Sequence, residues 1–199
     1  TSINETMSIR NSSAGTFLFD EQFSSSLFLG EYESAAGLLT AESFTLLALD
    51  GSLFILQEDQ LQPLSLSIPV PISRLQQSGS DIWLWGAGRL FRWSADVVSE
   101  VAIPGYDHIY SFALSANKLY LSVPWLVEIE ISESLKTSHF FDNIIDSMSV
   151  DHDGFLWFVE QGQLKLLRDK QILDLDFPDP VSSIFGPDIW IQGSETVYH

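Results

Sequence analysis

The chain of 199 residues carries 9 basic and 27 acidic side chains, which gives it a formal net charge of −18. Such a charge repels nucleic-acid backbones and anionic membrane surfaces, so neither is an expected partner. A hydrophobic content of 45%, with six Trp and fourteen Phe, nevertheless predicts a packed globular core.

Cysteine is absent, which excludes disulfides, thiolate metal sites and a cysteine nucleophile but leaves the compartment open. The longest uncharged stretch, 60–73, is broken by Pro63, Pro69 and Pro71. A membrane span needs about 20 mostly apolar residues, so no transmembrane helix is expected here. Any attachment to a membrane would come from segments outside this chain.

Short strands separated by turns are predicted along the chain. A weak strand around 7–10 precedes an apolar run at 15–19. The segment 31–43 is rich in Ala and Leu and could form a turn or two of helix, but Gly37 and the β-rich surroundings argue against a helix. Further on, alternation of apolar and small polar residues indicates strands. These segments are 44–49, 72–75, 110–114, 145–150 and 181–185.

A repeated motif connects these strands. Its clearest copy is Asp-Gly-Phe-Leu-Trp-Phe-Val at 153–159, and Asp-Gly pairs favour tight hairpin turns. Taking the residue in the Trp157 position as an anchor gives spacings of 36, 29, 37, 37 and 33 residues. A period of this length, built from short strands, is typical of a β-propeller. The anchors are Leu18, Phe54, Trp83, Tyr120, Trp157 and Trp190.

The motif resembles the two-component-regulator propeller repeat of bacterial extracytoplasmic sensor regions. The copy at 145–167 matches over its whole length, and the copy at 72–93 matches with Ser80-Asp81 where Asp-Gly is expected. The copy around Asn117 lacks both glycines, and the resemblance covers about residues 40–199.

The resemblance implies an all-β fold in which residues 1–199 form a single β-propeller domain. We expect about five to six short blades, or an open fragment of a larger propeller. The strand around Met7–Arg10 is a candidate to complete the last blade and close the ring. In an open fragment, the unpaired edges would instead associate with another copy, which makes a homodimer possible.

Catalytic and metal-binding patterns are weak. The run Asp151-His152-Asp153-Gly154 begins like a calcium loop, but apolar residues follow where further oxygen ligands are needed. We therefore interpret it as a hairpin turn capped by an aspartate. The histidines at 108, 139, 152 and 199 lack metal-ligand spacing, and no nucleophile elbow or phosphate-binding loop is present. No catalytic residues, metal or cofactor are expected.

The tryptophans predict where a ligand would bind. Trp83, Trp157 and Trp190 occupy the repeat position, which predicts that they pack between blades. Other aromatic and polar residues fall in the second turn of a blade or in a connection between blades, and in a propeller these segments share one face. Aromatic rings beside amides and carboxylates suit a sugar or peptide, although the Trp side chains could simply cover blade edges. The candidate ligand-binding residues are Trp85, Tyr106, His108, Trp125, Asp142, Asn143, Glu160 and Gln161.

The resemblance implies a non-enzymatic sensor domain, extracytoplasmic or periplasmic, of a bacterial signal-transduction protein. It would bind a small molecule, a saccharide, a peptide or a protein, and pass the signal to a histidine kinase or diguanylate cyclase. One alternative is a scaffold propeller for protein–protein interaction. A second is a propeller enzyme acting on polysaccharide, which is disfavoured because no residue set suggests an acid, base or nucleophile.

Overall fold

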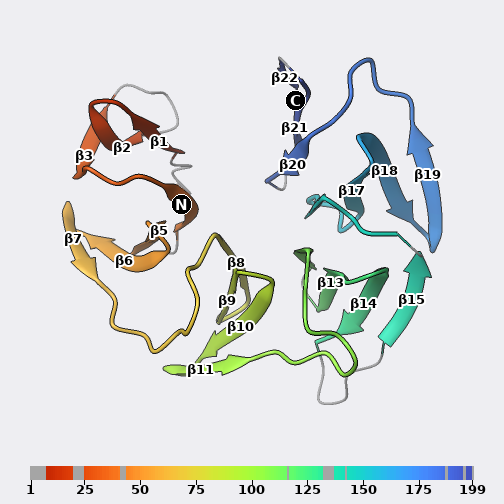
Figure 1. Cartoon of the computed structure of the whole chain (residues 1–199), viewed down its shortest axis with the longest axis horizontal. Helices are drawn as coiled ribbons and strands as arrows, with labels where there is room; N and C mark the ends of the chain where they lie inside the picture. Colours follow the sequence, from red (N-terminus) through yellow and green to blue (C-terminus); the bar gives the residue numbers. More distant parts are fainter. Residues whose placement is uncertain are drawn as a thin grey trace. The chain divides into compact units, whose positions relative to one another are not determined.

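The computed structural model describes residues 8–19, 25–40, 44–115, 117–131, 137–141, 143–186, 188–194 and 196–198. Within these ranges all regular structure is β-strand, arranged in six antiparallel sheets of three or four strands that follow one another along the chain (Figure 1). No helix that could cross a membrane occurs in these ranges. The chain divides into two compact units, Thr1–Val101 (unit 1) and Ala102–His199 (unit 2). We call the sheets blades 1 to 6.

Unit 1 contains three blades, each a simple up-and-down sheet in which sequence neighbours pair. Blade 1 consists of β1 (Ser8–Ser12), β2 (Gly15–Phe19) and β3 (Ser26–Gly30). Blade 2 consists of β4 (Ala35–Thr40), β5 (Thr45–Leu49), β6 (Ser52–Gln57) and β7 (Gln60–Pro63). Blade 3 consists of β8 (Arg74–Ser78), β9 (Asp81–Gly86), β10 (Arg89–Ser94) and β11 (Val97–Glu100).

Unit 2 repeats this arrangement. Blade 4 consists of β12 (Ser111–Ser115), β13 (Lys118–Ser122), β14 (Leu126–Glu130) and β15 (Thr137–Phe141). Blade 5 consists of β16 (Ser147–Val150), β17 (Leu156–Glu160), β18 (Gln163–Arg168) and β19 (Gln171–Leu175). Blade 6 consists of β20 (Ser183–Phe185), β21 (Trp190–Gln192) and β22 (Val197–Tyr198).

Two-residue hairpins join the second and third strands of blades 2, 3 and 5. Both central residues have positive φ in Asp50-Gly51, Ala87-Gly88 and Gln161-Gly162, the conformation that matches the twist of the paired strands. The Gly51 carbonyl accepts the N–H of Ile72, and the Gly162 carbonyl accepts that of Val181, each at 2.9 Å. The hairpin of one blade therefore fixes the point at which the chain enters the next.

These hairpins correct the predicted register of blade 2. Phe54 lies on the third strand, β6, opposite Leu47 of β5, and not on the second strand as its place in the repeat predicted. The hairpin at 50–51 aligns with those at 87–88 and 161–162, so Leu46 is the residue equivalent to Trp83 and Trp157. With Leu46 as anchor, three successive repeats are each 37 residues long.

Apolar packing between neighbouring blades forms the core of each unit. In unit 1, Leu46 and Ala48 of blade 2 pack against blade 3, where they contact Leu75 and Leu84. The other face of blade 2 packs against Leu18 of blade 1 through Leu47, Leu49 and Leu56. In unit 2, blade 5 packs through Met148 and Phe158 on blade 4, and through Val159 and Leu164 on Ile184 and Ile191 of blade 6. Alternate side chains along a strand thus pack against the blades on either side of it.

Other expectations are tested by the same strands. The segment 35–40 forms strand β4, which confirms the expectation that this part of 31–43 is not a helix. The N-terminal strand β1 pairs with β2 of its own sheet, and the prediction that it completes the last blade is wrong; Met7 lies outside the described residues. Trp83 is buried, and Trp157 packs against the core between blades 5 and 6. Trp190 is 41% exposed, so its assignment as a buried wedge is wrong.

Replacing Gly51 should test the hairpin contact with the next blade. A Cβ at Gly51 would lie 2.4 Å from Cβ of Pro71, whereas a Cβ at Gly79, which also has positive φ, meets nothing within 4 Å. Both alanine variants carry the cost of a left-handed backbone, but only Gly51→Ala adds the steric overlap. Gly51→Ala should therefore lower the free energy of unfolding by about 1–3 kcal/mol more than Gly79→Ala in urea denaturation. Equal losses in the two variants would contradict the proposed packing.

Candidate functional site

One end of the blades in unit 2 brings together the turns and connections that the sequence selected. Where the chain enters each blade, a backbone N–H donates to the end of that blade's second strand. The bonds run from Tyr110 to the Ser122 carbonyl at 2.7 Å and from Asp146 to the Val159 carbonyl at 3.0 Å. The connections between blades therefore lie beside the turns between second and third strands. We call this end of blades 4 to 6 the turn face.

Four aromatic side chains mark the turn face at blade 4. The rings of Tyr106 and Trp125 meet edge to face, with centroids 5.2 Å apart and an interplanar angle of 84°. The His108 and Tyr110 rings are 4.7 Å apart in a similar arrangement. Tyr106 and Trp125 are half-buried, and His108 and Tyr110 are exposed. These four residues, the aromatic cluster, offer ring surface and polar edges together.

A turn and a connection place this aromatic cluster. Trp125 ends the short turn between β13 and β14, and its carbonyl accepts the N–H of Val123 at 2.9 Å. Pro124 lies in this turn where blades 2, 3 and 5 have a glycine, and the turn has three residues, 123–125, where those blades have two. Tyr106 belongs to the preceding connection, where its N–H donates to the Ile103 carbonyl at 3.0 Å.

A buried polar network lies at the same end of blade 5. The Glu160 side chain is only 8% exposed and stands 2.9 Å from the Lys165 ammonium, which also contacts Asp174 Oδ1 at 2.9 Å. The Asn143 amide donates a hydrogen bond to Glu160 Oε1. Hydrogen bonds from Lys165 to Glu160 and then to Asp174 raise the pKa of the lysine. The charge of Glu160 is thereby compensated inside the protein.

A surface hollow of about 610 Å³ adjoins this network, at the second hairpin of blade 5 and the connection to blade 6. Its lining combines amides, carboxylates, prolines and an aromatic ring. The lining residues are Gln161, Gly162, Gln163, Leu164, Asp174, Leu175, Asp176, Phe177, Pro178, Asp179 and Pro180.

The structure places most of the predicted ligand residues on the turn face. Trp85 occupies the corresponding position at the end of the second strand in blade 3 of unit 1, where its carbonyl accepts the Ser73 N–H at 2.9 Å. Asp142 lies outside the described residues. The predicted residues on the turn face of unit 2 are Tyr106, His108, Trp125, Asn143, Glu160 and Gln161.

Sequence reasoning missed Lys165, Asp174 and Tyr110. Lys165 stands between Leu164 and Leu166 in the strand Gln163–Arg168, and a lysine beside a buried apolar position needs a carboxylate partner when its ammonium is buried. Its cross-strand partner is Asp174. That signal was available from the sequence, but the contact with Glu160 depends on the hairpin register.

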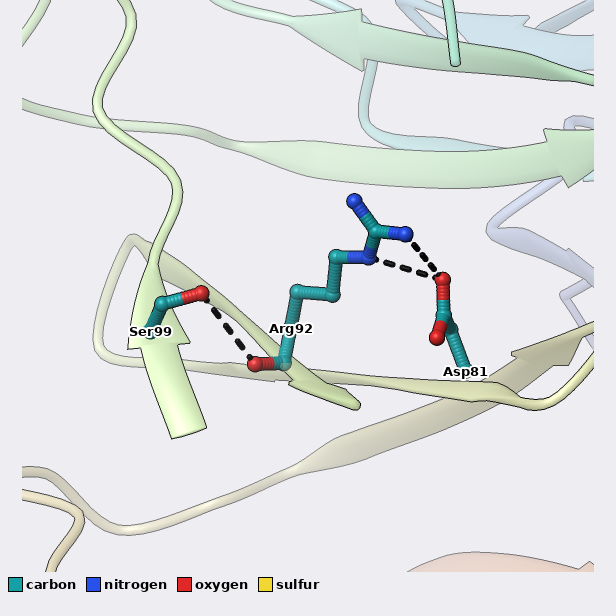
Figure 2. Close-up of polar contacts among 3 residues, drawn as sticks. All are labelled: Asp81, Arg92 and Ser99. Atoms are coloured by element: carbon teal, nitrogen blue, oxygen red, sulfur yellow. Dashed lines mark hydrogen bonds and ion pairs between the residues drawn. The ribbon is translucent and has the colours of Figure 1, made fainter. Parts of the chain in front are cut away.

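A second polar cluster lies on blade 3 in unit 1. Figure 2 shows the Arg92 guanidinium directed at Asp81, with Nε 2.8 Å from Oδ2, while the Arg92 carbonyl accepts a hydrogen bond from Ser99 Oγ. Arg92 also lies over the buried ring of Trp83, 5.7 Å from its centroid. The Ser94 hydroxyl and then Arg92 hold the pKa of Asp81 below its usual value. This cluster supports the repeat tryptophan and is a structural feature.

The run at 151–154 acts as the sequence predicted. Asp151 caps its turn by accepting the Phe155 N–H at 2.8 Å and the Trp157 indole N–H at 2.7 Å. His152 lies 3.0 Å from Asp188 of blade 6. Among the described residues, no group of three or more His, Asp or Glu gathers in a way that could hold a metal ion.

No family model and no curated protein matches the chain. Solved structures do. A gluconolactonase from Xanthomonas campestris matches with a TM-score of 0.68 at 18% identity, over 92% of this chain and 77% of its own. The WD40 β-propeller domain of Doa1 matches with a TM-score of 0.62 at 9% identity, over 92% of this chain and 69% of its own.

The extracellular domain of BT4673 from B. thetaiotaomicron, named as a hybrid two-component system, matches with a TM-score of 0.56 at 11% identity. The match covers 99% of this chain and 37% of that domain, so the chain spans little more than a third of its length. At these identities the similarities concern the fold alone. The six small antiparallel sheets and these structural matches identify an all-β chain with the β-propeller fold.

Removing the Lys165 charge should lower the free energy of unfolding, because Glu160 would remain buried without a positively charged partner. Lys165→Met keeps the length of the side chain but leaves Glu160 charged without its ammonium, and breaking such a pair costs about 3–5 kcal/mol of unfolding free energy. Asp174→Asn is the control, because that side chain is 78% exposed and should change stability by about 1 kcal/mol or less. Denaturant unfolding at pH 7 measures both effects.

The same pair predicts a pH dependence. Because the folded-state pKa of Lys165 is raised, its stabilisation is complete below the ordinary lysine pKa of about 10.4 and is lost as the pH rises through the folded-state value. The stability difference between wild type and Lys165→Met should therefore shrink in strongly alkaline buffer. A difference that stays constant across that range would show that packing alone stabilises this position.

Proposed function

We propose that this chain is a non-enzymatic binding domain of a bacterial signal-transduction protein, and that it binds a saccharide, peptide or protein partner on the turn face of unit 2. The observation that carries the proposal is the aromatic cluster. One edge-to-face ring pair, Tyr106–Trp125, joins the connection before blade 4 to the β13–β14 turn, and a second pair, His108–Tyr110, lies within that connection. Rings held by their neighbours lose little conformational freedom when a ligand stacks on them.

Glu160 supports a binding role over catalysis. A general acid or base must exchange its proton with a substrate near the working pH. Glu160 instead forms a buried ion pair with Lys165 and a hydrogen bond with Asn143. Within the turn face it serves to position the connection before blade 5, next to the residues available to a ligand.

The signalling role rests on the repeat, whose best copy at 145–167 resembles those of extracytoplasmic sensor propellers. The fold similarity to an extracellular domain of a two-component system is in keeping with it. A ligand on the turn face would favour one arrangement of blades or partners over another, which requires different affinities for the two states. The resemblance to extracytoplasmic sensor propellers is also the reason why we propose an extracytoplasmic location.

Truncating Trp125 should test the turn face as a binding surface. Trp125→Ala should weaken binding of a saccharide or peptide ligand found by screening by about 5–150-fold, because a stacked aromatic anchor typically contributes about 1–3 kcal/mol. Trp190→Ala is the matched control. It removes another partly exposed indole, which lies beside the turn between the first and second strands of blade 6, at the end opposite the turn face. Isothermal calorimetry measures both affinities. Equal weakening in the two variants would place the binding surface elsewhere.

The sensor role predicts a physical connection to an output domain. The gene that encodes this chain should continue into a membrane span and a histidine kinase or diguanylate cyclase, and Trp125→Ala in that full-length protein should abolish ligand-dependent output activity. A gene that encodes no signalling domain would reject the sensor role. Binding on the turn face without any output would instead support the scaffold function.

A further inference from the structure

The hollow beside blade 5 has an apolar base. Leu164 is buried, and Leu175 and Phe177 are half-buried in the core between blades 5 and 6. The Phe177 ring meets Tyr198 edge to face at 4.9 Å, which fixes its orientation. Pro178 and Pro180 complete this side with rigid rings. A volume of about 610 Å³ is within the range of sites that enclose a small ligand or a large side chain.

Negative charge surrounds this base without compensation from the lining. Asp174, Asp176 and Asp179 all line the hollow, and none of the described lining residues is a lysine or arginine. The ammonium of Lys165, which contacts the lining residue Asp174, is shared between Asp174 and Glu160. Asp179 accepts a hydrogen bond from the Tyr198 hydroxyl, which holds its carboxylate beside the Phe177 ring that packs on Tyr198. Carboxylates therefore outnumber the one ammonium, in a chain whose net charge is already −18.

We propose that this hollow receives a lysine or arginine side chain from a basic peptide segment of a partner protein. The aliphatic stem of such a side chain covers apolar surface, and its charged end remains free to meet a carboxylate. Phe177 and the prolines supply the apolar surface, and Asp176 at the exposed rim supplies the carboxylate. The side-chain amides of Gln161 and Gln163, both exposed, are placed to bond the peptide backbone.

Charge and shape together select this partner. An anionic peptide would place like charges beside the carboxylates, and such juxtapositions are strongly unfavourable at interfaces. A free inorganic cation would leave the apolar base uncovered. The hollow shares no residue with the aromatic cluster, so this inference stands or falls separately from the ligand proposed for Trp125.

The experiment measures fluorescence anisotropy of labelled peptides on the intact chain. Three peptides of equal length carry a central Lys-Arg, Ser-Ser or Glu-Glu pair in a Gly-Ser background. We expect saturable binding of the Lys-Arg peptide alone. This binding should weaken as the salt concentration rises from about 50 to about 300 mM, because salt screens the attraction between exposed charges. Binding of the Ser-Ser peptide with the same affinity would overturn the proposal.

Asp176→Asn tests the site, and Asp96→Asn is its matched control. Both aspartates are exposed, and Asp96 lies in the β10–β11 hairpin of unit 1. Asp176→Asn should weaken the Lys-Arg peptide about five-fold, while Asp96→Asn should leave it unchanged. Equal weakening by both variants would mean that net charge alone attracts the peptide and would reject the hollow. Trp125→Ala should not alter this binding, which separates its outcome from that of the ligand proposed for the aromatic cluster.

Discussion

Contact between neighbouring blades is the constraint on which the rest of the structure depends. A sheet of three or four short strands has two faces, and neither can be buried within the sheet itself. In blade 2, Leu46 and Ala48 face one neighbour while Leu47 and Leu49 face the other. Five consecutive residues of β5 are therefore buried, although strand side chains alternate. A repeat protein is stable only when each unit supplies the surface that the next one needs.

The same constraint explains what the sequence could predict. Apolar strands and hairpin turns recur at 37 residues because every blade must present similar faces to its neighbours, so the propeller fold and the strand content were readable. The strand register was not, because an Asp-Gly pair suits either hairpin of a blade. The pair at 50–51 joins the second and third strands, whereas Asp153-Gly154 lies between the first and second. The pairing of β4 with β5 makes β5 the second strand of blade 2, so the hairpin at 50–51 follows a second strand, and this pairing is not visible in the local sequence.

Side-chain exposure was harder to predict than strand position. Trp83 and Trp190 occupy the same place in the repeat, but Trp83 lies beneath Arg92 and is 3% exposed, whereas Trp190 begins a strand of three residues and is 41% exposed. The shorter sheet of blade 6 offers less surface to cover an indole. The candidate site was also only partly predictable. The repeat predicted which end of the blades holds the candidate residues. It did not predict the contacts among Asn143, Glu160 and Lys165, because these depend on a long-range register that local patterns do not contain.

The turn face is also where blades are joined, which relates the binding proposed there to the rest of unit 2. The Ile145 N–H donates to Ser122 Oγ at 2.8 Å, which ties the connection before blade 5 to blade 4. The Val181 N–H donates to the Gly162 carbonyl at the edge of the hollow, which ties blade 6 to blade 5. A ligand that contacts these connections contacts the hydrogen bonds that set blade position. The ligand proposed for the turn face would therefore act on blade packing through these hydrogen bonds, provided that its affinity differs between two packing states.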